Sequence, residues 1–572
     1  MAGGSPSGEL RPSMFPPPVN PAQEFTGPPT GAEHERVEVG VAIVGGGPAG
    51  TACAIRLVGL LEHDPQLTEQ LGETPVAILE QGRAAGARQL SGAVIDPRPL
   101  RELCADDDSW PRYDTVTRER VYFMPSSKRA IAVVPTPPPL RNRGNVVVSA
   151  AELTRWLAAK AERMGAHVLT ETAATKLLVR DGHVLGVRTG DKGRDRDGAR
   201  KGNFEAGSDV TARATVLAEG CWGHLTGAAI DALGLAGSDP QVWALGVKEV
   251  WDVEQPLHRV IHTLGWPLRA GARHRELGGS WIYPMNRDGQ APRVSIGFVA
   301  GLDHADVRLS VHDVLQELKR HPLVEKILAG GKRIAWGAKA IPEGGWWAMP
   351  TLHAPGMVIC GDGAGMVDVP RLKGVHLAIR SGMLAAEEIY TQLKAGSNDF
   401  SGYERAVRDS QIGRDLHRSR NIRQPFRRGL VVGGAISGAM VLTGGRLPGG
   451  HWRLRRDAEA PLRRTDRHER YPKPDDRYTF DKLSSVFISA NQTRDDAPNH
   501  IRVARRVDRD VAEMWQWMCP AGVYELPADA PASGPVDMIV NYTNCVQCGA
   551  ITAKGGRLTP PEGGDGPFYQ VT

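Results

Sequence analysis

Residues 39–50 read VGVAIVGGGPAG, and this stretch decides the fold. The apolar run at 39–44 is typical of a short buried strand, and glycines follow it at Gly45, Gly47 and Gly50. Such glycines permit a tight turn, a close approach of the backbone to a pyrophosphate, and close packing of helix against strand. The helix expected from position 51 would point its N-terminus at the phosphates. We therefore predict a dinucleotide-binding βαβ unit.

The next strand supports this interpretation. Residues 76–79 read VAIL and end at Glu80, which is placed to accept hydrogen bonds from ribose hydroxyls. A glycine-rich turn without a ligand is the alternative, because the glycine spacing alone is a weak signal. Its position between a strand and a helix favours the cofactor.

A second glycine turn indicates which dinucleotide is bound. Residues 357–365 read MVICGDGAG, with Gly361 and Asp362 directly after an apolar strand. An aspartate there can hold the ribityl and phosphate region of FAD, and a helix beginning at Gly374 would direct its positive end at the isoalloxazine. Two such turns serving one nucleotide favour FAD over NAD. We interpret His376 as a packing or orienting residue.

Composition limits the class of protein. The 572 residues contain 41% hydrophobic and 24% charged residues, as in soluble proteins with two or three domains. The formal net charge of +5 gives no reason to expect nucleic acid as a partner. Seven cysteines in so long a chain do not form a disulfide scaffold and favour a reducing compartment. Residues 1–36 are rich in Pro and Gly and are predicted to be a disordered tail without a targeting signal.

The cysteines near the C-terminus predict a metal centre. Cys519 precedes a proline, and Cys545 and Cys548 form a CxxC motif further along. This spacing is ferredoxin-like and lets thiolates from two loops bind one iron–sulfur cluster. The usual third cysteine of the second loop is missing, because Ile551 occupies its position.

These features together resemble the electron transfer flavoprotein–ubiquinone oxidoreductase family. The segments that carry the resemblance are GARQLSGA at 86–93, AEGCWGHL at 218–225, TLGWPL at 263–268, GGSWIY at 278–283, GGKRIA at 330–335, YPKPD at 471–475 and PEGGDGP at 561–567. They keep the family order from about residue 37 to the C-terminus. The resemblance implies an enzyme that passes electrons from reduced electron transfer flavoprotein through FAD and the cluster to ubiquinone, with no acid–base residue.

The resemblance also implies an organisation. The fold would be mixed α/β, with an FAD domain of the glutathione-reductase type over 37–480, an interleaved quinone-binding part over about 235–345, and a ferredoxin-like domain over 481–572. Ser91 and Gly92 would contact FAD. Gly278 and Gly279 would contact the quinone through the backbone, although a glycine pair also marks a strand bulge.

Several alternatives stay open. The family has a 4Fe-4S cluster, whereas three cysteines can also hold a 3Fe-4S cluster, or a 4Fe-4S cluster with one oxygen ligand. We favour a cluster of one of these kinds; the alternative is that the centre has been lost and the cysteines are remnants. The protein could be a prenyl-reductase-like flavoprotein of the same superfamily. It could also be a degenerate flavoprotein that docks on a membrane without turnover.

A membrane contact is expected at about 425–446. Residues 429–445 are apolar, uncharged and flanked by arginines, but the run is too short to span a bilayer. The pattern fits monotopic insertion, with arginines on anionic headgroups; a buried helix is the alternative. We expect the cytoplasmic face of a bacterial inner membrane, with the mitochondrial inner membrane second.

Overall fold

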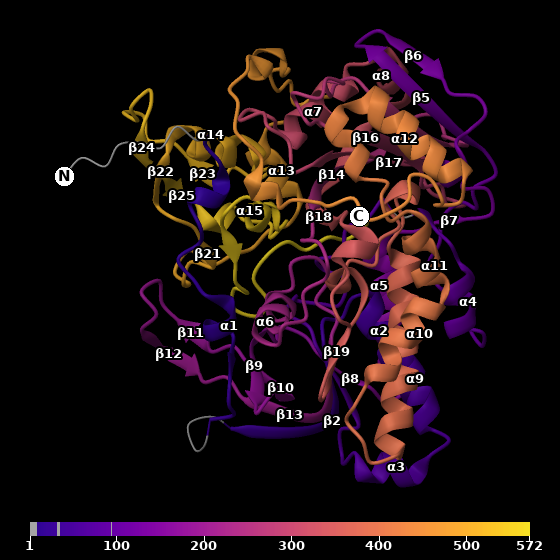
Figure 1. The fold of residues 1–572 in the computed structure, drawn as a ribbon, viewed down its shortest axis with the longest axis vertical. Helices are drawn as coiled ribbons and strands as arrows, with labels where there is room; N and C mark the ends of the chain where they lie inside the picture. The colour runs from indigo at the N-terminus through magenta and orange to yellow at the C-terminus, as the bar shows by residue number, and fades with distance from the viewer. Residues whose placement is uncertain (1–8, 31–34, 93) are drawn as a thin grey trace.

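Two large β-sheets with their helices form the body of the molecule, and the C-terminal part packs beside them (Figure 1). The computed structural model describes residues 9–30, 35–92 and 94–572. Within them, the strand expected at 39–44 is the buried half of β2 (Arg36–Val44). The strand expected at 76–79 is β3 (Val76–Leu79).

The first sheet has the order β1-β9-β10-β13-β2-β3-β8, and β20 pairs with both β13 and β19. Its other strands are β1 (Thr26–Gly27), β8 (His167–Leu169), β9 (Ala174–Arg180), β10 (His183–Thr189), β13 (Asp209–Leu217), β19 (His353–Ala354) and β20 (Met357–Ile359). Strands β3, β2, β13 and β20 are parallel, and their last residues Leu79, Val44, Leu217 and Ile359 are in register. Their carboxyl ends therefore share one edge, where open parallel sheets bind ligands.

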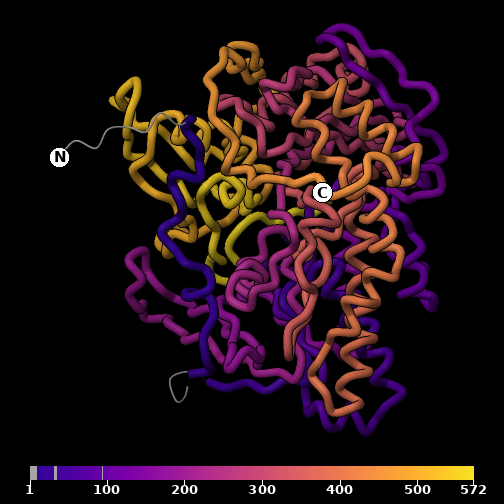
Figure 2. Tube along the Cα trace, viewed as in Figure 1, coloured from indigo at the N-terminus to yellow at the C-terminus, as the bar shows by residue number. Residues whose placement is uncertain are grey.

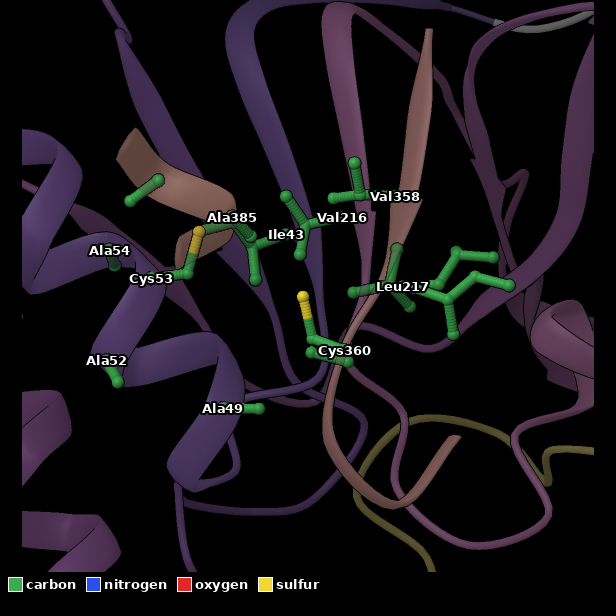
Figure 3. Packing of buried hydrophobic residues seen from close by; sticks show 14 of the residues in the cluster. Ile43, Ala49, Ala52, Cys53, Ala54, Val216, Leu217, Val358, Cys360 and Ala385 are labelled. Atoms are coloured by element: carbon green, nitrogen blue, oxygen red, sulfur yellow. The ribbon is translucent and has the colours of Figure 1, made fainter. Parts of the chain in front are cut away.

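Two helices cover the centre of this sheet. Helix α2 (Pro48–Leu61) follows the first glycine turn, and α9 (Val375–Lys394) begins after Gly374, as predicted. A Cβ atom on Gly382 would lie 2.1 Å from the carbonyl oxygen of Ala49, so glycine is what allows α9 to approach α2 this closely. Cys53 and Cys360 lie in this apolar core as free thiols (Figure 3).

The second sheet has the order β18-β14-β17-β16-β15-β5-β6. Its strands are β5 (Glu119–Ser126), β6 (Arg129–Ala132), β14 (Trp243–Asp252), β15 (Val260–Gly265), β16 (Gly278–Pro284), β17 (Arg293–Gly301) and β18 (Lys332–Pro342). Five of them come from 243–342, but the β5–β6 hairpin comes from much earlier in the chain and joins through parallel pairing of β5 with β15. Helix α7 (Val311–Lys319) packs on β14 and β17.

The C-terminal part consists of short elements. These are α13 (Lys482–Ile488), β21 (Ile501–Arg502), β22 (Arg506–Asp508), α14 (Arg509–Met518), β23 (Tyr524–Glu525), β24 (Pro535–Asp537), β25 (Ile539–Val540), α15 (Ala550–Ala553) and β26 (Arg557–Leu558). The strands pair as β21–β26, β22–β24 and β23–β25. Apolar side chains of α14 and α15 belong to the same core as the second sheet.

The remaining α-helices and β-strands connect these parts. They are α1 (Pro21–Glu24), α3 (Pro65–Gln70), β4 (Val94–Ile95), α4 (Arg98–Leu103), β7 (Val146–Val147), α5 (Ala150–Arg163), β11 (Lys192–Arg194), β12 (Arg200–Glu205), α6 (His224–Ala232), α8 (Pro322–Leu328), α10 (Ser401–Asp409), α11 (Gln411–Arg418) and α12 (Leu430–Leu442). Helix α12 lies within the segment expected at the membrane.

The N-terminal segment differs from the predicted disordered tail. Residues 9–30 run along the C-terminal part and then onto the first sheet (Figure 2). The backbone N–H of Leu462 donates to the carbonyl of Leu10, and β1 adds a parallel strand beside β9. The low-complexity composition of this segment hid these backbone contacts. Residues 1–8 and 31–34 of the predicted tail lie outside the described residues.

Candidate functional site: two adjoining cavities

The main cavity lies at the shared carboxyl edge of the first sheet and has a volume of about 290 Å³. Its wall includes Gly45 from the first glycine turn, Trp281 from β16 and Gln547 from the CxxC loop. All three parts of the fold therefore contribute to it.

Most of the predicted FAD residues line this cavity. They are Gly45, Gly47, Glu80, Ser91, Gly92, Asp362 and Gly374. Gly50 and Gly361 are not in the lining. A Cβ atom on Gly50 would lie 2.0 Å from the carbonyl oxygen of Gly45, and Gly361 has a φ of +64° beside α2 and α9. Both glycines therefore allow the backbone conformation and close packing around the cavity, but they do not form its wall.

Glu80 holds the glycine turn. Its carboxylate accepts hydrogen bonds from the backbone N–H groups of Gly46 at 2.9 Å and Gly82 at 2.6 Å. The side chain is buried and lines the cavity at the end of β3. These bonds to the backbone fix the carboxylate at the end of the strand.

Two ionisable groups at the second glycine turn have altered pKa values because of burial. Burial raises the pKa of Asp362 to about 6, although the positive charge of Lys339 opposes this. Burial lowers the pKa of Lys373 to about 8, and the Lys373 side chain donates to Asn142 at 2.5 Å. Both line the cavity. His376 is buried outside the lining, which agrees with the packing role predicted for it.

The Ser91–Gly92 loop is held against the second sheet. A Cβ atom on Gly92 would lie 3.2 Å from the ring of Tyr283 and 3.3 Å from that of Trp281, so the backbone runs close to these rings. The ammonium group of Lys248, fully buried on β14, donates to the carbonyl of Ser91 at 2.8 Å. Burial lowers the pKa of Lys248 to about 7.

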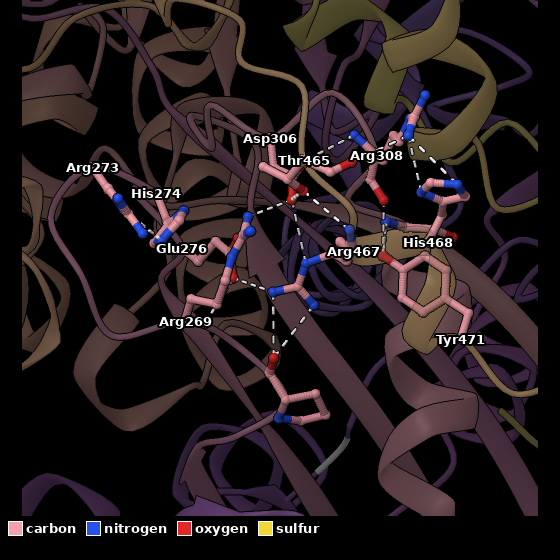
Figure 4. A network of polar contacts seen from close by, with 12 residues as sticks. Arg269, Arg273, His274, Glu276, Asp306, Arg308, Thr465, Arg467, His468 and Tyr471 are labelled. Carbon is pink, nitrogen blue, oxygen red and sulfur yellow. Dashed lines mark hydrogen bonds and ion pairs between the residues drawn. The ribbon is translucent and has the colours of Figure 1, made fainter.

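Gly278 and Gly279 stand beside the main cavity, not in its lining. They begin β16, and Gly279 pairs with Val299, which does line the cavity. A Cβ atom on Gly278 would lie 2.0 Å from the carbonyl oxygen of Val299, so the pair permits close strand packing. Two positions before Gly278, Glu276 is buried in ion pairs with Arg269 and Arg467, which fix this end of the strand (Figure 4).

A second, smaller cavity of about 20 Å³ lies where the sequence predicted a cluster. Its wall brings together the predicted ligands Cys519, Cys545 and Cys548, and it also includes Ile551 on α15. Two backbone N–H groups point at the sulfurs, from Ala521 to Cys519 and from Gln547 to Cys545, each at 3.4 Å. N–H donors of this kind stabilise thiolates that bind iron.

The chemistry of this pocket suits a cluster more than a single ion. In the part of the chain that the structure describes, no three His, Cys, Asp or Glu side chains converge closely enough to hold one metal ion. A cluster differs because separate irons take separate cysteines. Burial raises the pKa of Cys545 to about 12 and that of Cys548 further, and iron coordination is what keeps buried thiols ionised.

Among the residues that the structure describes, no fourth cysteine, histidine or carboxylate lines this cavity in place of Ile551. Its side chain is 4% exposed and faces the same cavity as the three thiols. Among the described residues that line this cavity, the polar or sulfur side chains besides the cysteines are the thioether of Met518 and the phenol of Tyr524. Burial and the neighbouring thiols raise the pKa of Tyr524, so this phenol is neutral.

The two cavities share a wall. Gly549 and Leu558 line both of them. Gln547, in the loop between Cys545 and Cys548, accepts a hydrogen bond from Arg88 through its side chain at 2.6 Å and from Lys339 through its carbonyl at 3.4 Å. Sequence reasoning missed these contacts, because Arg88 and Lys339 lie far from the cysteines in the chain.

Exposed apolar side chains gather at one end of the molecule. We call the set Phe123, Ile131, Val134, Val431, Val432, Leu442 and Leu447 the apolar patch. Its members lie on α12, on the β5–β6 hairpin and, for Val134 and Leu447, in the segments just after β6 and α12; Figure 1 shows these two elements at the same end of the molecule. Leu442 is 84% exposed and Val431 is 76% exposed. Among the described residues, no helix has the length and apolar character needed to cross a membrane.

Not all of the flanking arginines face solvent. Arg423 is buried and paired with Asp303 and with Glu343, the latter at 2.8 Å. It therefore holds the base of the α12 segment to the second sheet and is not free to meet a headgroup. The sequence pattern alone could not distinguish this arginine from its exposed neighbours.

Comparisons with known proteins agree with this geometry. The family model described as "ETF-QO, ubiquinone-binding" matches residues 243–341, and the model "Electron transfer flavoprotein-ubiquinone oxidoreductase, 4Fe-4S" matches residues 476–570. The mitochondrial electron transfer flavoprotein-ubiquinone oxidoreductase of Caenorhabditis elegans is 36% identical over 93% of this chain and 91% of its own length. The Pseudomonas aeruginosa protein of that name is 35% identical over 94% of this chain and 99% of its own length.

One solved structure supports the fold of the flavin part. A geranylgeranyl bacteriochlorophyll reductase-like protein from Thermoplasma acidophilum matches with a TM-score of 0.53, covering 74% of this chain and 95% of that one. At 18% identity this likeness shows the fold alone.

Proposed function

Because the chain belongs to the electron transfer flavoprotein–ubiquinone oxidoreductase family, we propose that FAD occupies its main cavity and an iron–sulfur cluster its small cavity, with electrons crossing the shared wall. The protein is an oxidoreductase that passes electrons from electron transfer flavoprotein to ubiquinone by means of these two cofactors. The observation that carries the assignment of sites is the wall itself, formed by Gly549 and Leu558.

In this assignment the protein binds and positions, and the cofactors supply the redox chemistry. Gly45 and Gly47 at the N-terminus of α2 would hold the pyrophosphate, and Glu80 the ribose. Asp362 would hold the ribityl region, with Gly374 at the start of α9. Cys519, Cys545 and Cys548 would hold the cluster.

The quinone is assigned to the side of the main cavity formed by the second sheet. Trp281 and Tyr283 provide aromatic walls there, and Gly246 and Val299 leave the sheet surface open to a planar ring. Gly278 and Gly279 would contact the ring only from the edge of this site, since Val299 stands between Gly279 and the cavity.

The apolar patch would provide the membrane contact. A hydrophobic quinone reaches the protein from the bilayer, and the patch joins the predicted segment on α12 to the β5–β6 hairpin of the quinone sheet. The membrane contact we propose therefore includes the β5–β6 hairpin as well as the segment at about 425–446 that was predicted from the sequence. We propose peripheral attachment to the cytoplasmic face of a bacterial inner membrane.

Neither alternative function is favoured. A prenyl-reductase-like flavoprotein would need no C-terminal cysteine domain, whereas this chain matches the iron–sulfur model over 476–570. A docking protein without turnover would have no use for a second cavity lined by three cysteines beside the first.

The proposal is tested with purified protein that contains FAD, iron and sulfide in measured amounts. Given reduced electron transfer flavoprotein, it should reduce a water-soluble ubiquinone analogue. Gly47→Val should abolish FAD binding, because the added side chain fills the pyrophosphate space and begins 2.9 Å from the side chain of Gln89.

Gly59→Val on the same helix is the matched control, since a Cβ atom there meets only Met164 at 3.6 Å. Full FAD occupancy in Gly47→Val would overturn the assignment of the main cavity. A wild-type protein with both cofactors that fails to reduce the quinone would overturn the function.

A further inference from the structure

We propose that Trp222 is the aromatic contact between the two cofactors, and that it carries the electronic coupling between the flavin cavity and the cluster loop. The inference rests on the proposed positions of FAD and the cluster. It concerns a residue to which neither the sequence pattern nor the proposed function assigns a role.

The position of Trp222 is the first observation. Its side chain lines the main cavity, in the turn that follows β13. A Cβ atom on Gly549 would lie 2.4 Å from Cδ1 of this indole, so the ring is in direct contact with the backbone next to Cys548. Only glycine at 549 leaves this space for the ring. Gly549 also lines the small cavity, so an indole of the main cavity contacts a residue that belongs to both sites.

The conformation of Trp222 is the second observation. Its φ of +60° lies in the left-handed region, which is uncommon for a bulky residue and persists only where the surroundings impose it. The ring is stacked on Trp243, with centroids 3.9 Å apart and planes inclined by 23°. Trp243 begins β14 and is itself buried. The backbone conformation and the stacking on Trp243 therefore fix the position of the indole.

The polar edge of the ring is the third observation. The Nε1–H group of Trp222 is buried and has no hydrogen-bond partner among the described residues. A buried donor without a partner costs free energy, and such groups in native proteins usually meet a ligand or water. In a cavity built for FAD, a cofactor atom is the partner that fits this donor.

Together these contacts suit an electron path. The rate of electron tunnelling falls steeply with distance, and it falls more steeply across an empty gap than through packed atoms. The ring fills what would be a gap between the flavin side and the peptide that follows Cys548. One electron leaves one cofactor and one electron arrives at the other; the indole is not oxidised, no bond changes and no proton is required at Trp222.

The competing path is the loop residue Gln547. It is held by Arg88 and Lys339 and also lines the main cavity. Its contacts are polar and charged, so they tune electrostatics at both sites, whereas Trp222 supplies the packed aromatic contact. The two roles differ in what they change. Loss of a charge contact shifts reduction potentials, and loss of the ring changes the rate at constant potential.

The experiment uses the full chain loaded with FAD and cluster, as wild type, Trp222→Phe and Trp222→Leu. Trp156→Leu on α5 is the control, because this half-buried indole lines neither cavity. After rapid mixing with reduced electron transfer flavoprotein, flavin absorbance and freeze-quenched electron paramagnetic resonance give the rate of exchange between the cofactors. Potentiometry gives both potentials. Flavin fluorescence is recorded in loaded and in cluster-free protein.

We expect Trp222→Leu to slow the exchange by roughly tenfold or more with both potentials unchanged, and Trp222→Phe to fall between. Flavin emission should rise in both variants, since a contacting indole quenches it, and should not rise in Trp156→Leu. Unchanged exchange in Trp222→Leu, or slowing matched by a shift in potential, overturns the proposal. Trp222→Leu can lose its cluster. In that case the proposal is overturned if Trp222→Phe exchanges electrons between the cofactors at the wild-type rate and the flavin emission of cluster-free Trp222→Leu equals that of cluster-free wild type. Absence of either cofactor from the wild type would instead refute the proposed function.

Discussion

Ile551 stands where the family spacing has a cysteine ligand. Its side chain faces the three thiols from α15, in the position where the family spacing has a ligand. Cysteine is smaller than isoleucine, so Ile551→Cys adds a thiol to the cavity without crowding it. The substitution therefore asks what the missing ligand does to the cluster.

We expect the oxidised wild type to give a 3Fe-4S signal in electron paramagnetic resonance, or to lose one iron readily to chelators. Ile551→Cys should convert it to an ordinary 4Fe-4S centre with chelator-resistant iron. Ile551→Val is the control, since it changes volume without adding a ligand. A wild type free of iron that reduces quinone as fast as Ile551→Cys would contradict the cluster and its place in the electron path.

From the lowered pKa of Lys248 we expect the stability of the protein to depend on pH. Burial lowers its pKa from 10.5 to about 7. Between these values the unfolded chain holds a proton that the folded protein lacks, so the free energy of unfolding rises with pH, by at most about 1.4 kcal/mol per pH unit. Below pH 7 both states are charged and above pH 10.5 both are neutral, so the contribution is flat there.

Lys248→Met should flatten this rise, because methionine carries no titrating proton. At pH 10, where little of the cost of burying the lysine is left, the variant should also be less stable, because the bond to the Ser91 carbonyl is lost. Denaturation midpoints of both proteins, measured from pH 7 to pH 10, give the difference in slope. Other buried lysines titrate in the same window, so the comparison between variants, rather than the wild-type curve, decides the matter. Equal slopes would show that Lys248 stays charged in the folded protein.

The helices and strands that the sequence predicted correctly are those whose signals lie close together in the chain. β2, β3, β20 and the starts of α2 and α9 follow from apolar runs and glycines that lie next to one another in the chain. The β5–β6 hairpin could not be predicted as part of the quinone sheet, because its partner β15 lies far along the chain. The same limit concealed the wall between the cavities, where Trp222, Arg88 and Lys339 meet the CxxC loop.

The exposed apolar side chains of α12 lead to a prediction about membrane binding. Within the apolar run, Ile436 is half-buried, whereas Val431 and Leu442 are far more exposed. Replacing Val431 and Leu442 with Asp should weaken binding to anionic vesicles by about 3 kcal/mol, or roughly 100-fold. Vesicle sedimentation measures this, and salt should weaken wild-type binding without abolishing it.

The control for the α12 variant lies on α13. Leu483 and Phe487 are 57% and 87% exposed but belong to the C-terminal part and not to the apolar patch. Their replacement with Asp should leave sedimentation unchanged. Equal loss in both variants, or no binding by the folded, flavin-loaded wild type, would rule out insertion through α12.

At the scale of the whole molecule, residues 9–30 tie the C-terminal part to the first sheet. The carbonyls of Pro12 and Phe15 lie over Gly555, where a Cβ atom would meet them at 2.7 and 3.1 Å. Further along, Phe25 packs edge-to-face on His224, with ring centroids 5.3 Å apart, and β1 extends the sheet. One strap thus contacts both the loop after the cluster helix α15 and the flavin sheet.

Deleting residues 1–30 should therefore loosen the C-terminal part more than the flavin part. We expect the thermal midpoint to fall by several degrees and iron to be lost faster to chelators, while FAD content stays near that of wild type. Deleting only residues 1–8 removes none of these contacts and serves as the control. The strap acts because it fixes the two cofactor sites on either side of the wall that Gly549 and Leu558 form. If the longer deletion retains iron as firmly as wild type, the core shared by the second sheet and α14 alone holds the cluster domain in place, and the strap has no part in positioning it.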